Sequence, residues 1–360
     1  MAFRFIGAAF WSTNLRIKGV LKLTYIIPVY NSVDCVIVCL EGIYSLPFNE
    51  NGFEVIVVDD CSTDNTLDAL NDYASKHSNM VVLHQEVNQR QGAARNRGID
   101  VAKGEYIAFC DADDTIVANG VMNALRAVSE TKADICYFDF EYETSDGAWR
   151  LFEMPKETRN KILTASDYLN IYYTCYYNAP WRNLYRTDFL RKTGVRFVEG
   201  VRWEDCDWTV KVYAQAKTIQ FVEGVGYRYA FNEKSVSKQR SVKAMSERVY
   251  AGLRLIKLGD EVREQMPSLS KTISDEGKNY YVDDTIRLRN LTKYSSKQCA
   301  ELVENIGEDH LNALAHYSWP AWDSFFINHR HLSSFFLLFA CPMAGAGRKL
   351  VNTLRVSRKK

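Results

Sequence analysis

The segment FEVIVVDDCSTD, residues 53–64, is an apolar run that ends abruptly in two aspartates. Continuous rather than alternating apolar residues indicate a strand covered on both faces, as in a parallel sheet flanked by helices. Four further runs share this pattern and predict neighbouring strands: TYIIPVY (24–30), MVVLH (80–84), EYIAFC (105–110) and ADICYFDF (133–140). The sequence therefore predicts a mainly parallel sheet in the first part of the chain.

The stretches between these strands have helical character. In residues 64–76, apolar residues recur on one face at helical spacing. Residues 92–103 and 119–131 predict two more helices, and Gly104 is a natural residue just past the end of the first. Strands that alternate with helices imply right-handed crossovers and a doubly wound α/β layer.

The second half of the chain has a different texture. Residues 166–177 are dense in tyrosine, and short strands are expected near 219–222 and 225–231. Apolar residues at helical spacing predict a helix over 240–262. Residues 270–316 are polar and helical in character, so we expect a helical region after the α/β layer.

Composition excludes some classes of protein. The 45 basic and 44 acidic residues leave a net charge of +1, which argues against a protein that binds nucleic acid over its whole surface. The nine cysteines include no CxxC pair, and several lie inside apolar runs, which favours buried reduced thiols in a cytosolic protein. No apolar stretch reaches the ~18 residues of a transmembrane helix, and residues 1–21 do not resemble a secretory signal.

The tail, residues 331–360, joins an apolar cluster at 335–339 to basic residues from Arg348 onward. An apolar run this short cannot span a bilayer, but apolar and basic residues together suit the surface of an anionic membrane. Docking of the run on the protein's own helical region is equally compatible with the sequence. We expect a cytoplasmic protein whose tail offers a peripheral contact with the cytoplasmic face of the membrane.

Acidic residues follow two of the predicted strands. Ligands of open α/β sheets bind at the carboxyl ends of strands. Asp111, Asp113 and Asp114 repel one another unless a cation joins them, and Mg²⁺ or Mn²⁺ takes one or two carboxylates plus substrate phosphates. A solvated acidic turn would have the same sequence. Asp59 and Asp60 fit either a turn with a helix cap or hydrogen bonds to a nucleobase or ribose.

Two further features carry chemistry. Arg95, in GAARNRG, is either a surface arginine or a partner of phosphate or base groups at the strand ends. The chain has no GxGxxG motif or P-loop lysine, so no glycine-rich loop is expected to hold phosphates. The stretch WEDCDW, residues 203–208, sets three acids between two tryptophans. That pattern fits either a general base with raised proton affinity or the acidic first turn of a helix.

Six ordered blocks together resemble the family 2 glycosyltransferases of GT-A fold. The blocks are IIPVYN, VIVVDDCSTDNT, NQRQGAARNRGI, GEYIAFCDADD, WRNLYRTDFL and RWEDCDW, and the similarity covers roughly residues 22 to 240. Two departures are Cys61, where the family usually has glycine, and residues 89–91, where it usually has small side chains. The similarity fades beyond residue 240, so acceptor recognition does not carry over.

The resemblance implies a role for each matching residue. Asp205 would be the catalytic base, and Asp113 would be the chief metal ligand, assisted by Asp111. The implied cofactor is Mn²⁺ or Mg²⁺. The nucleotide-sugar site would consist of Pro28, Tyr30, Asp60, Asn88, Arg95, Asp111 and, less firmly, Arg228 in GYRYAFNEKSVSKQ.

These observations predict an α/β protein of GT-A (Rossmann-like) type, with a helical C-terminal region. We expect an arm (1–21), a catalytic domain (22–240), a helical accessory region (241–330) and the tail (331–360). The predicted reaction is inverting transfer from a UDP-sugar to a saccharide or lipid-linked saccharide, in surface polysaccharide synthesis. Two alternatives stay open: a sugar nucleotidyltransferase, and a non-catalytic binding subunit.

Overall fold

The computed structural model describes residues 23–47, 52–155, 158–159, 161–165, 167, 179–233, 235, 241–264, 266–267, 269–278 and 280. The predicted arm, the tail and most of the tyrosine-dense stretch lie outside the described residues. So does the predicted helical region beyond residue 280.

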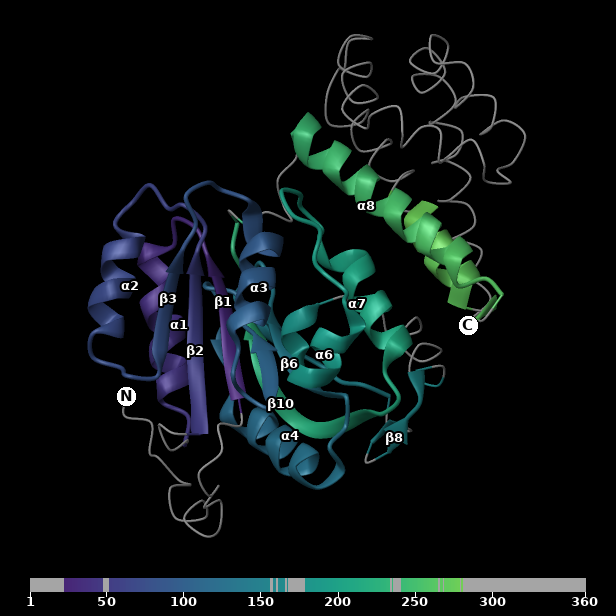
Figure 1. Ribbon diagram of the computed structural model, residues 1–360, viewed down its shortest axis with the longest axis horizontal. Coiled ribbons are helices and arrows are strands. Elements are labelled where there is room, and N and C mark those ends of the chain that lie inside the picture. Colours follow the sequence, from purple (N-terminus) through teal and green to yellow (C-terminus); the bar gives the residue numbers. More distant parts are fainter. Residues whose placement is uncertain are drawn as a thin grey trace.

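The first four main strands form the parallel half of one sheet (Figure 1). Strand β1 (Leu23–Val29) lies between β2 (Phe53–Asp59) and β4 (Tyr106–Phe109) and runs parallel to both. Strand β3 (Met80–His84) extends the sheet beside β2, again in parallel. β1 and β2 are buried along their whole length, which is why their sequences are apolar without alternation.

The second half of the sheet is mixed. Strand β9 (Asn183–Arg186) enters antiparallel between β4 and β6 (Ile135–Glu143). Strand β10 (Ile219–Tyr229) then runs parallel to β6. The short strands at this end are β5 (Thr115–Ile116), β7 (Trp149–Phe152) and β8 (Ile162–Leu163), which pair antiparallel with β10, β6 and β10 respectively.

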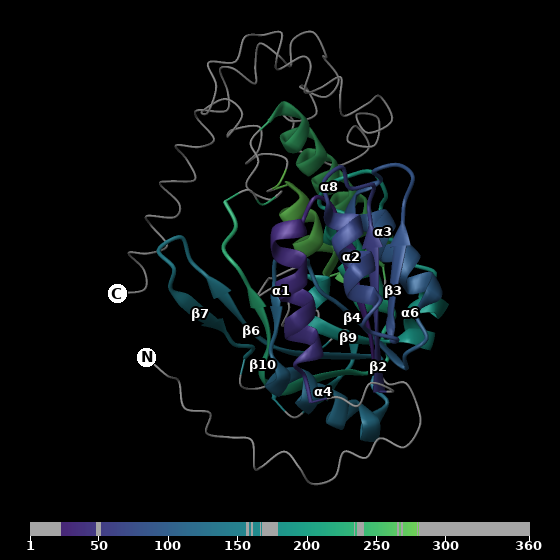
Figure 2. The ribbon, with the colours of Figure 1, turned by 90° about the vertical axis from the view of Figure 1, so that its left-hand side faces the viewer.

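Helices cover both faces of the sheet, and α1 and α3 lie on opposite faces (Figures 1 and 2). The helices that the sequence predicted are α2 (Thr66–Ala74), α3 (Arg90–Val101), α4 (Ala118–Thr131) and α8 (Val242–Glu261). Helix α1 (Val33–Tyr44) was not predicted. The remaining elements are the 3-10 turn η3 (Pro180–Arg182) and the helices α6 (Thr187–Thr193) and α7 (Asp205–Gln215).

One predicted boundary was wrong. The expected strands near 219–222 and 225–231 are a single strand, β10, with a register shift between Val222 and Val225. Gly224 lies in this irregular stretch with φ of +115°, a conformation that residues with a side chain rarely adopt. In the sequence this glycine suggests a gap between two strands, whereas in the fold it allows a bulge inside one strand.

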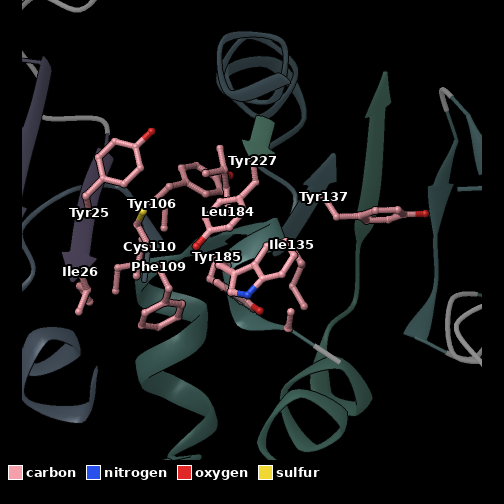
Figure 3. Close-up of a cluster of buried hydrophobic side chains, with 14 of the residues drawn as sticks. Tyr25, Ile26, Tyr106, Phe109, Cys110, Ile135, Tyr137, Leu184, Tyr185 and Tyr227 are labelled. Atoms are coloured by element: carbon pink, nitrogen blue, oxygen red, sulfur yellow. The ribbon is translucent and has the colours of Figure 1, made fainter. Parts of the chain in front are cut away.

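The core continues across the change from parallel to antiparallel pairing (Figure 3). Tyr25, Phe109, Tyr185 and Tyr227 come from four strands and are all fully buried. The indole of Trp208 on α7 stacks on Phe197 with ring centroids 4.0 Å apart. It also makes edge-to-face contacts with Phe109 and Tyr185, whose ring centroids lie 5.8 and 5.4 Å from its own. Aromatic pairs contribute about 0.5–1.5 kcal/mol each beyond their burial, so Trp208 fixes the start of α7 against the sheet.

Two whole-chain expectations can be compared with the described residues. None of the helices in the described part of the chain combines the length and apolar character that crossing a membrane requires. Of the cysteines described, Cys39, Cys110, Cys136 and Cys206 are buried free thiols.

Candidate active site

The carboxyl ends of β1, β2 and β4 meet at one edge of the sheet, and Asp60 lies there directly after β2. Its Oδ1 accepts hydrogen bonds from the backbone N–H of Gln89 (2.8 Å) and from Nε2 of Gln85 (2.6 Å). Burial raises the pKa of Asp60, and these two donors oppose that shift. Asn88 joins the same group, because its Nδ2 donates to the carbonyl oxygen of Asp60 at 3.1 Å.

The neighbouring Asp59 has a structural role instead. Its fully buried Oδ2 contacts Nδ1 of His84 at 2.8 Å and accepts from the backbone N–H of Ser62 at 3.2 Å. Asp59 therefore holds the turn after β2, and of the pair only Asp60 has its carboxylate beside Gln89 and α3.

The three acids after β4 differ in their surroundings. Asp114 is buried, and its carboxylate accepts from Tyr227 Oη (2.7 Å) and from the backbone N–H of Ala230 (2.9 Å). Burial and the charges of Asp111 and Asp113 raise the pKa of Asp114 well above its ordinary value. Asp113 is exposed, with Oδ2 accepting from the side-chain amide of Asn232 at 2.8 Å. Asp114 is thus part of the scaffold, and Asp113 faces solvent.

The acids left on the open side suit a divalent cation that shares its ligands with a substrate. Among the described residues, no three His, Cys, Asp or Glu side chains gather closely enough to hold a metal ion by themselves. Mg²⁺ and Mn²⁺ in phosphate-handling sites need only one or two carboxylates, because phosphate oxygens and water supply the rest. Asp113, exposed, and Asp111, whose side chain is 26% exposed, fit this donor set.

Arg95 connects these acids to the WEDCDW stretch. It lies on α3 with its side chain 2% exposed. Nη2 lies 2.7 Å from Oδ1 of Asp111, and Nη1 pairs with Oε1 of Glu204, which is fully buried. Burial lowers the pKa of Arg95, but the two carboxylates outweigh burial and raise it above its ordinary value. A permanently charged guanidinium therefore bridges the two acidic segments.

Of the three acids in WEDCDW, the structure leaves one partly exposed. Glu204 is buried against Arg95, and Asp207 is buried between Arg254 (2.9 Å) and Lys211 (2.6 Å). Asp205, the first residue of α7, keeps part of its surface open to solvent. Burial of the rest and the negative charge of Glu204 raise the pKa of Asp205 to about 8, against the opposing charge of Arg95.

A family model for glycosyl transferase family 2 matches residues 24–194. These residues form a family 2 glycosyltransferase domain. The acids after β2 and β4 and the bridging Arg95 all lie inside this domain, and Asp205 follows it on α7.

Relatives of known sequence extend over much of the chain. The uncharacterized glycosyltransferase YibD of Escherichia coli is 29% identical over 60% of this chain, and poly(ribitol-phosphate) beta-glucosyltransferase of Bacillus spizizenii is 32% identical over 58%. The matches span 63% and 32% of the lengths of these two relatives. Part of each relative therefore has no counterpart in the aligned stretch.

The solved structure of Staphylococcus aureus TarS 1-349, crystallised with UDP, shares the fold. It is 20% identical, with a TM-score of 0.61, and the match covers 91% of this chain and 92% of that one. The shared fold confirms the prediction of a GT-A type α/β architecture.

A glycine of the family 2 domain allows α3 to approach Glu204, the residue before α7. A Cβ added to Gly92 would lie 2.5 Å from the carbonyl oxygen of Val198 and 3.2 Å from Cγ of Glu204. Any side chain here would push α3 away from the loop before α7. Gly92 therefore permits the short contact between Arg95, one turn later, and Glu204.

The structure brings most of the predicted nucleotide residues together, but it does not bring Arg228 to them. Pro28 is buried near the end of β1, and Tyr30 follows that strand with 47% of its side chain exposed. Arg228 pairs through Nε with Glu141 at 2.6 Å and lies over the ring of Trp149. Adjacent residues of a strand point to opposite faces, so Tyr227 reaches the acids and Arg228 points away from them.

Sequence reasoning missed several residues of this site. The Oη of Tyr227 accepts from the backbone N–H of Asp111 at 3.0 Å while it donates to Asp114, so it fixes the acidic turn. Asn232 holds Asp113, and Gln85 holds Asp60. Their residue types gave no signal, although Tyr227 and Asn232 lie in the GYRYAFN stretch that resembles the family.

Proposed function

We propose that this protein transfers a sugar from a UDP-sugar to a hydroxyl group of a saccharide or lipid-linked saccharide, with inversion, in surface polysaccharide synthesis. The family 2 domain supports sugar transfer. TarS, crystallised with UDP, supports a uridine nucleotide as the donor's leaving group. A relative named for transferring glucose to poly(ribitol-phosphate) supports a polymer as the acceptor.

One observation carries the proposal. Arg95 pairs at once with Asp111, on the donor side, and with Glu204, the residue before Asp205. The proposed donor contacts and the proposed base therefore share one buried charged bridge. A protein that only bound nucleotide would have no need to connect its nucleotide site to the segment that carries a partly exposed acid, Asp205, on another helix.

Inverting transfer is a single displacement. The acceptor oxygen attacks the anomeric carbon as the bond to UDP breaks, and the acceptor hydroxyl must lose its proton near that moment. Asp205 accepts this proton in our proposal. A carboxyl group with a pKa of about 8 suits the task, because a general base works best when its pKa lies near the working pH.

The donor would lie along the strand ends. In this proposal Pro28 and Tyr30 line the base pocket, Asp60 accepts from uracil, and Asn88 and Arg95 complete the nucleotide site. Asp113, with Asp111, would hold a divalent cation, which when bound offsets the charge that develops on the departing diphosphate.

The test compares two carboxylates that are neighbours in the chain. Asp205→Asn keeps the shape but cannot accept a proton, and we expect UDP release to fall by ~10²–10⁴-fold with UDP affinity unchanged by calorimetry. If Asp205→Asn turns over at the wild-type rate and Glu204→Gln does not, the base is Glu204. Release of pyrophosphate from UTP and a sugar 1-phosphate, with no UDP released from any donor, would indicate a nucleotidyltransferase. The absence of product with every donor of a panel, and with UTP and sugar 1-phosphates, would indicate a binding subunit.

A further inference from the structure

The base loop, residues 201–207, leads into α7 at Asp205 and contains a backbone conformation that costs free energy. Trp203 has φ of +61°, in the left-handed region that bulky residues avoid. Such a conformation persists only where contacts around it compensate for the cost. Contacts that hold Trp203 therefore also set the direction in which Asp205 enters the site.

Several of these contacts come from α8, which packs beside α7 (Figure 1). Nη2 of Arg254 donates to the carbonyl oxygen of Trp203 at 2.6 Å, and Nε donates to Oδ1 of Asp207 at 2.9 Å. One guanidinium thus joins the residue two before Asp205 to the residue two after it. The side chain of Arg254 is only 10% exposed, so water screens these contacts little.

Asp207 remains charged within this bridge. Burial by itself would raise the pKa of Asp207, but the charges of Arg254 and Lys211 outweigh burial and lower it. Asp207 therefore stays ionised beside Arg254, and the pair persists wherever Asp205 changes its protonation.

Two further residues of α8 contact the same region. The guanidinium of Arg248 lies 5.1 Å from the ring centroid of Trp203. Glu247 pairs with Arg202 of the base loop at 2.8 Å and with Arg90, the first residue of α3, at 3.2 Å. Arg90 also has a positive φ, of +66°. Helix α8 therefore contacts two residues of positive φ, one at the start of α3 and one before α7.

We propose that Arg254 is a positioning residue that aims Asp205 at the acceptor, and that α8 is part of the active site rather than an accessory region. The proposal rests on the proposed function, since it assigns Arg254 a role in turnover through Asp205. Arg254 acts through the loop and is not itself a catalytic residue.

The experiment uses the full chain and three variants. Arg254→Met removes both contacts. Arg254→Lys keeps a charge beside Asp207, but a single ammonium cannot reproduce the planar two-contact geometry. Arg186→Met is the matched control, because it breaks another partly buried arginine–aspartate pair, with Asp134, away from the base loop.

We expect both Arg254 variants to lose turnover by about 10²-fold, with UDP affinity unchanged, since misplacement of a reacting group by about 1 Å has that effect. Backbone amides of residues 201–207 should exchange hydrogen faster in both, while those of β1 and β2 should not. The pH at which turnover reaches half its maximum should fall, because a loosened loop admits water around Asp205. Arg186→Met should show none of these changes.

Three results would overturn the proposal: Arg254→Lys with wild-type turnover, a turnover loss no larger than that of Arg186→Met, or unchanged exchange in residues 201–207. Asp205→Asn, measured in parallel, separates this proposal from the proposed function. An active Asp205→Asn refutes the assignment of the base whatever Arg254 does. An inactive Asp205→Asn with a fully active Arg254→Met refutes only the positioning role.

Discussion

The turnover of this protein should depend on pH through one carboxyl group. Asp205 has a pKa of about 8, so about 1% of it is ionised at pH 6, about 9% at pH 7 and about half at pH 8. Because only the ionised carboxylate can accept the acceptor's proton, turnover at saturating donor should rise about tenfold from pH 6 to pH 7. It should level off above pH 9.

The same structure predicts how a neighbouring residue shifts this profile. Burial is the largest cause of the raised pKa, and the charge of Glu204 is the next. Glu204→Gln removes that charge and keeps an oxygen that can accept from Arg95. The pKa of Asp205 should therefore fall, and the rise in turnover should move to lower pH.

The assay is UDP release between pH 5.5 and pH 9.5, with UDP affinity measured by calorimetry over the same range. Affinity separates the titration of Asp205 from that of Asp60, whose pKa is also raised and whose protonation would weaken donor binding. Turnover that stays level from pH 6 to pH 9 would refute the assignment of Asp205. A Glu204→Gln profile at the wild-type position would refute the electrostatic explanation.

Four further predictions concern separate parts of the chain. Arg95→Met should lower the free energy of unfolding in urea by about 3–5 kcal/mol, because it leaves the fully buried Glu204 without its cation; a loss below 1 kcal/mol would contradict this. Asp113→Ala should abolish turnover without destabilising the fold, and EDTA should have the same effect on the wild type. Asp68→Ala, at an exposed position of α2, is the control and should leave turnover unchanged; full transfer in excess chelator would exclude the metal. Gly92→Ala should cost about 1–3 kcal/mol through overpacking against Val198, and Gly52→Ala, where a Cβ meets nothing within 4 Å, is the neutral control. Deleting residues 331–360 should reduce co-sedimentation with anionic vesicles, and unchanged sedimentation would refute the predicted membrane contact.

The parallel strands of the first half and the helices α2, α3 and α4 were predictable because they rest on local sequence, although α1 was not predicted. The runs at 24–30, 53–58 and 105–110 are short and apolar without alternation, which is the pattern of a strand covered on both faces. Since parallel strands end at the same edge, the acids that follow 53–58 and 105–110 were expected along that edge, whereas their separation follows from the strand order, which places β1 between β2 and β4. The predicted edge of the sheet and its acidic character followed from covalent neighbours alone.

The pairing of the second half of the sheet was decided by the tertiary structure. β9 lies antiparallel between two strands that are distant from it in sequence. It has only four residues, and so short a stretch of sequence does not indicate the direction in which the strand runs. The bulge in β10 likewise depends on its partner β6, because a glycine in a strand and a glycine at a break look the same in sequence.

The roles of individual acids also came only from the fold. Asp111, Asp113 and Asp114 are nearly equivalent in sequence, yet one pairs with Arg95, one is exposed and one is buried under Tyr227. In WEDCDW, Glu204 is buried against Arg95 from α3 and Asp207 against Arg254 from α8, whereas Asp205 is partly exposed. The proton affinity of a carboxylate depends on the charges and the water around it. Here those charged or polar neighbours include residues more than a hundred positions away in the chain, so the sequence alone did not identify them.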